Sequence, residues 1–468
     1  MKKTGLLSFV GLGALAAGLS MAPAAQANGR YPQAMQFAED PSDPNRIWLM
    51  STYGFLTSPD RGATWSWICE QALGVSTSVP FDPTFGIHQN GTLIMGLTDG
   101  LRRSDNGGCG WEQAIPEVMG SFVLDVAVDP SLKSRGLALV SYGTTPDGGT
   151  GTVYTNQIWE TTDNAGSFHL LASNFRNDIY STTLDAAPSD PQRIYITAQA
   201  LVDADGGQTS SPLLMRSRDR GKNWESRPIP MKLVGSSYIA AVHRTNPDIL
   251  YVRTFEIRDD SVERRAESSL LYTTNAGDTW RELFRGEAPM LGFALAADDS
   301  ELFIGLGDPG DRATTVDPAK LGVWRASTAD FQFEKRFDQT VSCLSWSTHG
   351  LYACSRLDPA GFDLGLSKDG ARTFETIQNR RRIQGPIACA AGTEAANLCT
   401  AELWKSMCET NLGCETPDAG TSPEPRKNDD DDDGCGCRLA GARTETARAA
   451  LLGLLGALGL ALRRVRRR

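Results

Sequence analysis

One eight-residue pattern recurs along the chain and limits the folds that it can adopt. The first copy, SPDRGATW from Ser58, fits the pattern S-x-D-x-G-x-T-W, which we call the box. Five further copies are SDNGGCGW from Ser104, TTDNAGSF from Thr161, SRDRGKNW from Ser217, TTNAGDTW from Thr273 and SKDGARTF from Ser367. Successive copies begin 46, 57, 56, 56 and 94 residues apart, and the last interval is nearly double. GVWRASTADFQF, from Gly322 to Phe333, fits that gap as a degenerate copy, so we expect seven repeated units.

A second pattern repeats in phase with the box. A Pro- and Asp-rich turn followed by a short β-rich run precedes the copies, as in DPSDPNRIWLM from Asp40, APSDPQRIYITA from Ala187 and RTNPDILYVRT from Arg244. Each unit therefore reads as strand, turn, strand, variable loop, strand, box and strand. Four short strands in such a unit are the sequence form of a β-propeller blade. We expect an all-β fold, a seven-bladed β-propeller of four-stranded blades over residues 28–385.

The residue types of the box suit a tight turn between two strands. Its Asp can accept hydrogen bonds from the amides of the turn, its Gly permits positive φ, and its final aromatic residue can pack between blades. We assign this structural role to Ser58, Asp60, Gly62, Trp65, Asn106, Trp111, Asp163, Phe168, Ser217, Asp219, Gly221, Trp224, Asn275, Gly277, Trp280, Ser367, Asp369 and Phe374.

The box resembles the Asp-box, or BNR, repeat of sialidases, sortilin-type receptors, photosystem II assembly factors and xyloglucan-cleaving glycosidases. The resemblance covers roughly residues 33–385 and implies a β-propeller of the sialidase-like superfamily. It implies no particular activity, because the same repeat serves enzymes and binding proteins.

The N-terminus has the order of a secretory signal peptide. A basic start at Lys2 and Lys3 is followed by an apolar stretch from Gly5 to Met21 and by Ala25-Gln26-Ala27. We interpret residues 1–27 as a signal peptide cleaved after Ala27; the alternative is a core helix of the mature protein.

The C-terminal segment also has a recognisable succession of parts. Residues 416–434 are rich in Pro, Gly and Asp and predict an acidic linker, and residues 435–468 hold Cys435, Cys437, an apolar run and an arginine cluster. The apolar run from Ala449 to Leu462 is shorter than a bilayer-spanning helix requires.

This C-terminal order resembles the MYXO-CTERM sorting tail of myxobacterial surface proteins. The resemblance implies cleavage near Cys435 or Cys437 and attachment to the outer surface by export and sorting machinery. An ordinary C-terminal membrane helix is the alternative. We therefore expect a protein exported to the cell surface of a myxobacterium-like Gram-negative bacterium, or secreted, with membrane contact only through this tail or anchor.

The charge of the body differs from that of the whole chain. The chain has a net charge of −10, but the two ends hold ten basic residues and one acid, so residues 28–437 carry about −19. Such a charge repels polyanions and argues against nucleic-acid binding.

Ten cysteines suit an oxidising compartment. Cys343 and Cys354 flank a predicted hairpin turn at Thr348-His349, so we expect a disulfide between them. Cys69 and Cys109 lie in or next to neighbouring boxes and could clamp two blades together.

The remaining four cysteines fall in a Cys-rich appendix over residues 386–415, where the sequence predicts one helix from about Glu394 to Asn411. Cys399 and Cys408 are too far apart on that helix to pair with each other. They would join Cys389, Cys414 or the last blade, with the connectivity open.

Catalytic motifs are sparse. A sialidase-like site would need three arginines, and Arg30-Tyr31-Pro32 departs from the motif expected for the first of them. A glycosidase needs two carboxylates that face each other. The body contains 55 acidic residues, and the sequence alone cannot identify such a pair among them. His88, His169, His243 and His349 are too scattered for zinc, and Asp203 to Gly207 reads as a polar loop rather than a calcium loop. We expect no metal and no cofactor.

The leading hypothesis is a monomeric, non-catalytic recognition domain for an extracellular glycan or protein. Its specificity would lie in four long insertions, Thr144 to Gln157, Val202 to Ser211, Arg258 to Ser269 and Gly307 to Ala319. The alternative is a secreted glycoside hydrolase, sialidase-like or xyloglucanase-like, with paired carboxylates near the central opening.

Overall fold

The computed structural model describes residues 32–76, 81–145, 152–173, 175–204, 207–260, 263–309 and 316–413. The predicted signal peptide with Ala27, the acidic linker, Cys414 and the sorting tail with Cys435 and Cys437 lie outside the described residues.

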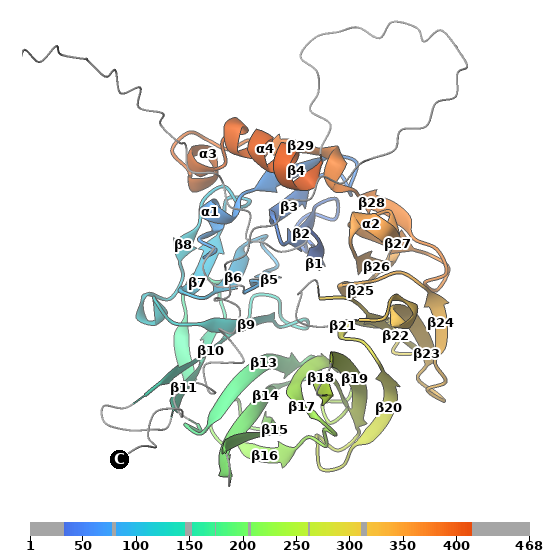
Figure 1. Cartoon of the computed structure of the whole chain (residues 1–468). Coiled ribbons are helices and arrows are strands. Elements are labelled where there is room, and N and C mark those ends of the chain that lie inside the picture. Colours follow the sequence, from blue (N-terminus) through green and yellow to red (C-terminus); the bar gives the residue numbers. More distant parts are fainter. Residues whose placement is uncertain are drawn as a thin grey trace, which may run out of the picture.

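Seven sheets stand around a common axis, and each holds four consecutive antiparallel strands (Figure 1). The first strand of each blade lies innermost, and the other three consecutive strands follow it outward. This architecture confirms the predicted seven-bladed propeller. Blades 1 to 3 comprise β1 Ala34–Glu39, β2 Ile47–Ser51, β3 Gly54–Ser58 and β4 Trp65–Ile68; β5 Thr84–Ile87, β6 Leu93–Leu97, β7 Gly100–Ser104 and β8 Glu112–Gln113; β9 Val123–Val128, β10 Gly136–Thr144, β11 Val153–Thr161 and β12 His169–Ser173.

The remaining blades follow the same plan. They are β13 Ile179–Ala187, β14 Asp190–Ala204, β15 Gly207–Ser217 and β16 Glu225–Pro228; β17 Val234–Val242, β18 Leu250–Asp260, β19 Glu263–Thr273 and β20 Arg281–Gly286; β21 Met290–Leu295, β22 Glu301–Leu306, β23 Gly322–Ser327 and β24 Glu334–Phe337; β25 Cys343–Ser347, β26 Gly350–Cys354, β27 Leu364–Ser367 and β28 Glu375–Gln378. Blade 6 contains the degenerate repeat, with its β23 and β24 on either side of the degraded box.

Each box forms the turn between the third and fourth strands of its blade. In blade 1 the amide of Thr64 donates to Asp60 Oδ1 at 2.8 Å, and the amide of Gly62 donates to Ser58 Oγ at 2.7 Å. Gly62 has a φ of 96°, and the indole of Trp65 donates to the Gly62 carbonyl at 3.1 Å. The polar side chains therefore satisfy the amides of a turn that the strands leave unpaired.

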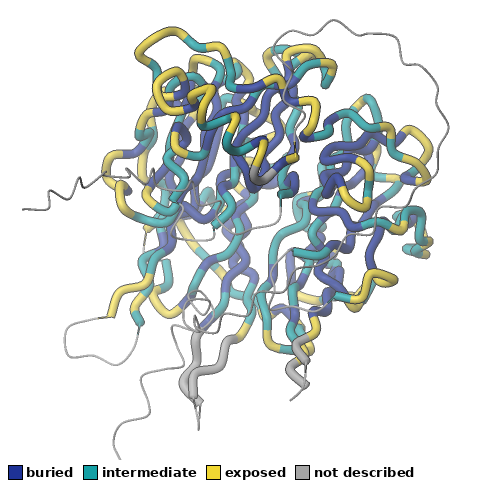
Figure 2. Tube along the Cα trace, turned by 45° about the horizontal axis from the view of Figure 1, so that its top comes forward, coloured by how far each residue is buried: buried dark blue, intermediate teal, exposed yellow. Residues whose placement is uncertain are grey.

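The middle strands of a blade are buried, as blade 1 shows. All residues of β2 and β3 are buried, and Trp48 stacks on Phe55 with ring centroids 4.9 Å apart. Buried segments form the interior of each blade and exposed ones its turns (Figure 2).

Three of the four predicted loop insertions are strand hairpins. β10 with β11, β14 with β15 and β18 with β19 extend their pairing into these regions, and Val202 pairs with Thr209 near the tip of blade 4. These three insertions therefore lengthen the hairpins of blades 3, 4 and 5. Of the fourth insertion, residues 310–315 lie outside the described part, and η2 Pro318–Lys320 follows them.

Short helices connect or follow the blades. Within the ring these are α1 Glu70–Leu73, η1 Pro116–Val118, α2 Leu357–Ala360 and η3 Arg380–Arg382. After blade 7 come β29 Ile383–Pro386, α3 Glu394–Leu398, α4 Ala401–Met407 and the π-helix η4 Cys408–Leu412. No helix among the described residues has the length and apolar character needed to cross a membrane.

The segment after blade 7 closes the ring on blades 1 and 2, and we call residues 383–412 the clasp. β29 adds to blade 1 as a fifth strand, parallel to β4. Trp404 of α4 packs on Trp67 of β4 with ring centroids 5.1 Å apart. The chain therefore returns to its first blade after one full circuit.

Disulfides fasten this clasp. Cys69 pairs with Cys399 and Cys109 pairs with Cys389. The expected clamp between Cys69 and Cys109 was therefore wrong, and so was the expectation that Cys399 joins Cys389, Cys414 or the last blade. Cys69 and Cys109 are therefore each bonded to the clasp, which covers the outer edge of blades 1 and 2. Cys408 is also disulfide-bonded.

The predicted hairpin disulfide is present, because Cys343 and Cys354 are opposed on β25 and β26 and are bonded. The single predicted helix, in contrast, is interrupted. Cys399 leaves helical geometry with ψ 66°, and Thr400 begins α4 by accepting a hydrogen bond from the Leu403 amide at 3.1 Å. A Thr cap and a pinned cysteine therefore divide the segment.

Candidate functional site: the axial channel

The innermost strands surround a channel along the propeller axis. Such a strand has a neighbour on its outer side only, so its inner edge carries unpaired amides and carbonyls. Side chains of the adjacent blade satisfy some of them. Asp125 of β9 accepts from the Leu184 amide of β13 at 2.9 Å, and Thr183 of β13 accepts from the Ile239 amide of β17 at 2.9 Å.

Comparable bridges recur around the ring. Gln36 of β1 exchanges two hydrogen bonds with the backbone of Phe85 on β5, at 2.9 and 3.2 Å. Arg253 of β18 donates to the Met290 carbonyl at 2.5 Å, and Ser342 donates to the Ala34 carbonyl at the junction of blades 7 and 1. These contacts fix the blades around the axis and leave the remaining channel surface for a ligand.

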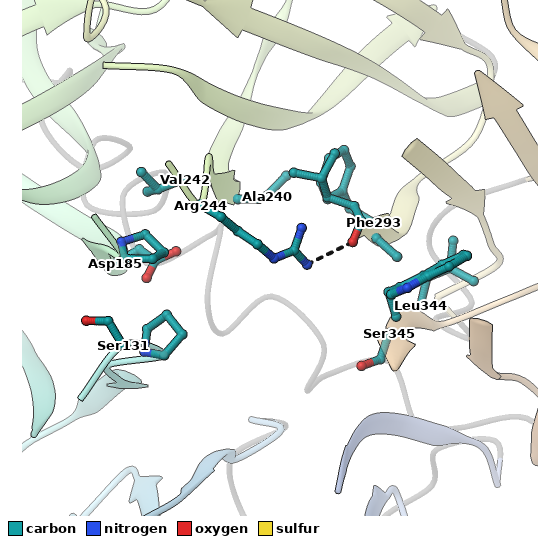
Figure 3. A pocket seen from close by; sticks show the side chains of 14 residues that line it. Ser131, Asp185, Ala240, Val242, Arg244, Phe293, Leu344 and Ser345 are labelled. Carbon is teal, nitrogen blue, oxygen red and sulfur yellow. Dashed lines mark hydrogen bonds between the residues drawn. The ribbon is translucent and has the colours of Figure 1, made fainter. Parts of the chain in front are cut away.

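A pocket of about 580 Å³ opens on the channel from the face that carries the turns between the first and second strands (Figure 3). Five blades contribute to its wall. Its lining residues are Pro130, Ser131, Asp185, Pro188, Ala240, Ala241, Val242, Arg244, Phe293, Ala294, Leu295, Leu344, Ser345 and Trp346. The volume and the mixture of apolar walls with a few polar groups are typical of a site for a small ligand or a single side chain.

Two aromatic side chains of this wall are held by the core behind them. Phe293 packs on Tyr251 with ring centroids 5.3 Å apart, and Trp346 stacks on Phe303 with ring centroids 5.5 Å apart. Their orientation is therefore set before any ligand binds.

Asp185 is the one carboxylate among the lining residues, and Figure 3 shows it beside Ser131. Its Oδ1 accepts from the Ala186 amide at 2.8 Å. Burial among the surrounding blades and, to a lesser extent, the nearby charges of Asp125 and Asp129 raise its pKa to about 7, against the hydrogen bond from the Ala186 amide. A carboxyl group with such a pKa changes its charge near neutral pH.

Asp125 lies on the neighbouring strand. Burial raises its pKa to about 7 as well, against the opposing effects of its hydrogen bonds to the Leu184 and Val126 amides and of the Arg253 charge. The channel thus holds two carboxyl groups with raised pKa values, and the charge of Asp125 disfavours the ionisation of Asp185.

Arg244 is the one basic residue among the lining residues, and it extends along the pocket toward blade 6 (Figure 3). Its guanidinium donates to Asp299 Oδ1 at 2.6 Å and to the Leu295 carbonyl at 3.0 Å, and also to the Ala296 carbonyl. His243 Nε2 lies 3.4 Å from Asp299 Oδ2. The charge of Arg244 is therefore balanced within the protein.

The four histidines that the sequence analysis examined do not meet. His88 is buried, with Nδ1 2.8 Å from the Lys133 carbonyl, and desolvation lowers its pKa. His169 lies beside Glu160 and His349 beside Arg61 and Glu39. Within the described ranges no three His, Cys, Asp or Glu side chains converge as metal ligands would. Arg30 and Tyr31, from the sialidase-like comparison, lie outside those ranges.

Sequence reasoning did not single out Asp125, Asp185, Arg244, Phe293 or Trp346. A signal was present for the two acids. LDVAVDP from Leu124 and LDAAP from Leu184 each place an Asp within the otherwise apolar first strand of a unit. A charged residue at that position of a blade would have indicated the channel.

Fold and pocket together define a seven-bladed β-propeller with a ligand-sized axial site. Among solved structures, an ancestral GH74 enzyme is similar at 13% identity and a TM-score of 0.51, over 74% of this chain and 46% of the enzyme. A GH74 xyloglucanase from Xanthomonas campestris matches at 14% identity and a TM-score of 0.34, over 77% of this chain and 66% of that one. The extracellular domain of a hybrid two-component system from B. thetaiotaomicron matches at 12% identity and a TM-score of 0.42, over 69% and 37%.

These likenesses show the fold alone, since the identities are low and the chain spans about half the length of the ancestral enzyme. No protein-family model matches the chain, and no curated protein matches it in sequence. The disulfides Cys69–Cys399, Cys109–Cys389 and Cys343–Cys354 favour an extracytoplasmic location.

Proposed function

We propose that this propeller is a non-catalytic recognition domain whose axial pocket binds an extracellular glycan or protein group. The observation that carries the proposal is the pocket itself, about 580 Å³ between five blades with preset aromatic side chains. Aromatic rings give contact area to the flat faces of sugars and to side chains at little entropic cost. Ser131, Ser345 and Asp185 add hydrogen-bonding groups that would orient the ligand.

Two further statements belong to the same proposal. On the basis of the box repeats we assign the chain to the Asp-box propellers, and the turn geometry of blade 1 supports this assignment because Asp60, Ser58 and Gly62 take the expected roles. The tail after residue 434 would attach the domain to the outer surface of the cell, where its ligand would be met.

The test combines binding and turnover in one experiment. Residues 28–437 are presented to glycan and peptide arrays, and every ligand that binds is assayed for hydrolysis. We expect binding without turnover, and Trp346→Ala should weaken it by at least about tenfold, as loss of an aromatic contact at the centre of a site does. Trp324→Ala serves as a control because it removes an aromatic residue of blade 6 that does not line the pocket. A ligand that binds equally to Trp346→Ala would place the site elsewhere.

One observation favours a glycoside hydrolase as second candidate. Asp125 and Asp185 share the channel, and a pKa of about 7 for each would suit a general acid or base at neutral pH. Against this, Asp125 is engaged with two backbone amides as an inter-blade bridge. Turnover that is abolished by Asp185→Asn, in a protein that still binds and folds, would replace the recognition proposal with the enzymatic one.

A further inference from the structure

The charges of the axial pocket restrict the chemistry of its ligand. Asp185 is the carboxylate of the lining, and among the ion pairs of the described residues none within 4 Å involves Asp185 or Asp125. Asp129, the other acid that acts on Asp185, is already paired with Arg135 at 3.0 Å. The pocket therefore offers a carboxylate with no cationic partner from the protein.

Arg244 does not fill that role. Its guanidinium is directed to Asp299 and to two carbonyls of blade 6, which leaves its charge compensated. Arg253 of β18 lies with its guanidinium 5.0 Å from the Tyr238 ring centroid and donates to the Met290 carbonyl. The Arg253 charge lowers the pKa of Asp125, but it is not among the causes that shift the pKa of Asp185.

The face around the mouth of the pocket also carries a net negative charge. The inner strand ends and the turns that follow them, residues 39–46, 88–92, 129–135, 185–193, 243–249, 296–300 and 348–349, contain nine carboxylates and five Lys or Arg residues. A face with this balance attracts cations toward the mouth of the pocket and disfavours anions.

Phe293 and Trp346 complete the chemistry. Aromatic faces attract organic cations through their quadrupole, most strongly where water is excluded. A bare metal ion would not use these rings, and the described residues hold no cluster of metal-ligating side chains. A carboxylate beside aromatic and aliphatic walls is instead suited to an ammonium group carried on an apolar or sugar skeleton.

From this arrangement we infer that the axial pocket binds a primary ammonium group, carried by an amino sugar or by a lysine side chain, with Asp185 as its counter-ion. The inference rests on the proposed recognition function and names the ligand class of the same site. Both sources share the chemistry of an alkylammonium ion, and the test separates them.

The experiment uses the full chain expressed with its own leader and measures calorimetric binding of three probes. These are the β-1,4-linked trimer of glucosamine, its fully N-acetylated counterpart and Nα-acetyl-lysine methylamide. We expect at least one amine to bind, the acetylated trimer to bind at least about tenfold more weakly than the amine trimer, and Asp185→Asn to lower amine affinity by at least about tenfold. The tighter of the two amines assigns the source.

Asp298→Asn is the matched control. It removes one carboxylate from the same face but outside the pocket, where Asp298 bonds only its turn neighbour Ser300, so amine affinity should stay within about twofold. Asn at 185 keeps an acceptor for the Ala186 amide, and thermal unfolding of Asp185→Asn checks that the fold is retained.

Binding of the lysine derivative should also depend on pH. Its ammonium stays charged between pH 6 and pH 8, whereas Asp185 ionises over that interval, so affinity should rise with pH and the rise should vanish in Asp185→Asn. The groups facing Asp185 are Asp125 and Asp129, and their charges shift its titration upward.

Each alternative outcome has a distinct meaning. Equal binding of acetylated and amine trimers overturns the ammonium inference but leaves the recognition proposal intact. Absence of amine binding, with another array ligand dependent on Trp346, has the same consequence. Equal losses in Asp185→Asn and Asp298→Asn would show attraction by the face alone and would also overturn the inference.

Discussion

Asp163 shows what a single box residue contributes. It accepts from the Ser167 amide at 2.9 Å and from the Ser167 hydroxyl at 2.7 Å, and these hydrogen bonds lower its pKa to about 2. Its folded pKa lies below the unfolded value, so its contribution to stability is present above pH 4 and is lost as pH falls toward 2. In two other boxes Asn stands at this position and accepts the equivalent amide, as Asn275 does from Thr279 at 2.9 Å.

The first prediction follows from that comparison. Asp163→Ala should lower the free energy of unfolding by about 1 kcal/mol at pH 7, because the turn amides lose their acceptor while solvent replaces part of it. Asp163→Asn should lose less, and its stability should vary less than that of the wild type between pH 5 and pH 2. Denaturant titrations at several pH values measure both. An Ala variant as stable as the Asn variant would contradict the role assigned to the side chain.

Asp125 has the opposite linkage. Its pKa is raised to about 7, so ionisation costs stability in the folded state, and the cost grows as pH rises from about 4 to 7. Relative to the wild type, Asp125→Asn should therefore gain about 2 kcal/mol of unfolding free energy between pH 5 and pH 8.

Measurement of the pH dependence isolates this effect from the hydrogen bonds that Asn loses, since those are independent of pH. Asp298→Asn is again a suitable control, because hydrogen bonding to Ser300 lowers the pKa of Asp298 and no such gain is expected. A difference that shrinks with rising pH would refute the assignment of a raised pKa to Asp125.

At the scale of elements, the repeat predicted the blades well. The spacing of the boxes located even blade 6, whose box has lost its Asp and Gly, because the interval of 94 residues between the copies at Thr273 and Ser367 is long enough for two units. Trp324 and Phe333 of that blade still pack against Phe284 of β20 in blade 5. Turn conformation and strand length depend on residues that are adjacent in the chain, so both can be predicted from the sequence.

The channel could not be predicted in the same way. Five innermost strands contain a one-residue bulge, as where Thr182 is skipped in the pairing of β13 with β14 and Ala240 in that of β17 with β18. A bulge changes which side chains face the axis, so strict alternation no longer tells inside from outside. The pocket also joins blades 3 to 7, which approach one another only after the ring has closed.

The clasp is the element with the largest predicted effect on stability. With Cys109–Cys389 intact, Cys69–Cys399 closes a loop of about 50 residues through both segments, and its loss should cost about 4 kcal/mol. Loss of Cys343–Cys354, across a separation of 11 residues, should cost about 3 kcal/mol. Loss of both clasp disulfides should cost on the order of 10 kcal/mol, which is the whole stability of an ordinary domain.

This ranking of stability costs is tested by replacing both cysteines of each disulfide with serine. The variants are compared by denaturant unfolding and limited proteolysis. The two single clasp variants should remain folded and the double variant should unfold or become sensitive to protease. A folded, resistant double variant would show that β29 and the Trp67–Trp404 contact close the ring without covalent help.

At the scale of the whole molecule, the proposed sorting tail would determine where the domain acts. If residues 435–468 form a sorting tail, then replacing Cys435 and Cys437 by Ala should leave the protein uncut or released into the medium. Cell fractionation and the apparent mass of the product measure the outcome. Ser substitution at Cys408 is a useful comparison, because it alters a cysteine of the domain and should leave sorting unchanged. Normal processing and surface retention of the double Ala variant would contradict the sorting hypothesis.

The position of α4 has a consequence for presentation. It packs outside β29, beyond the outermost strand of blade 1, so the described chain ends at the rim of the ring rather than on either flat face (Figure 1). A tether that continues from residue 413 would attach the propeller through its rim. Neither mouth of the channel would then be the point of attachment, so both could remain open to molecules that diffuse past the cell surface.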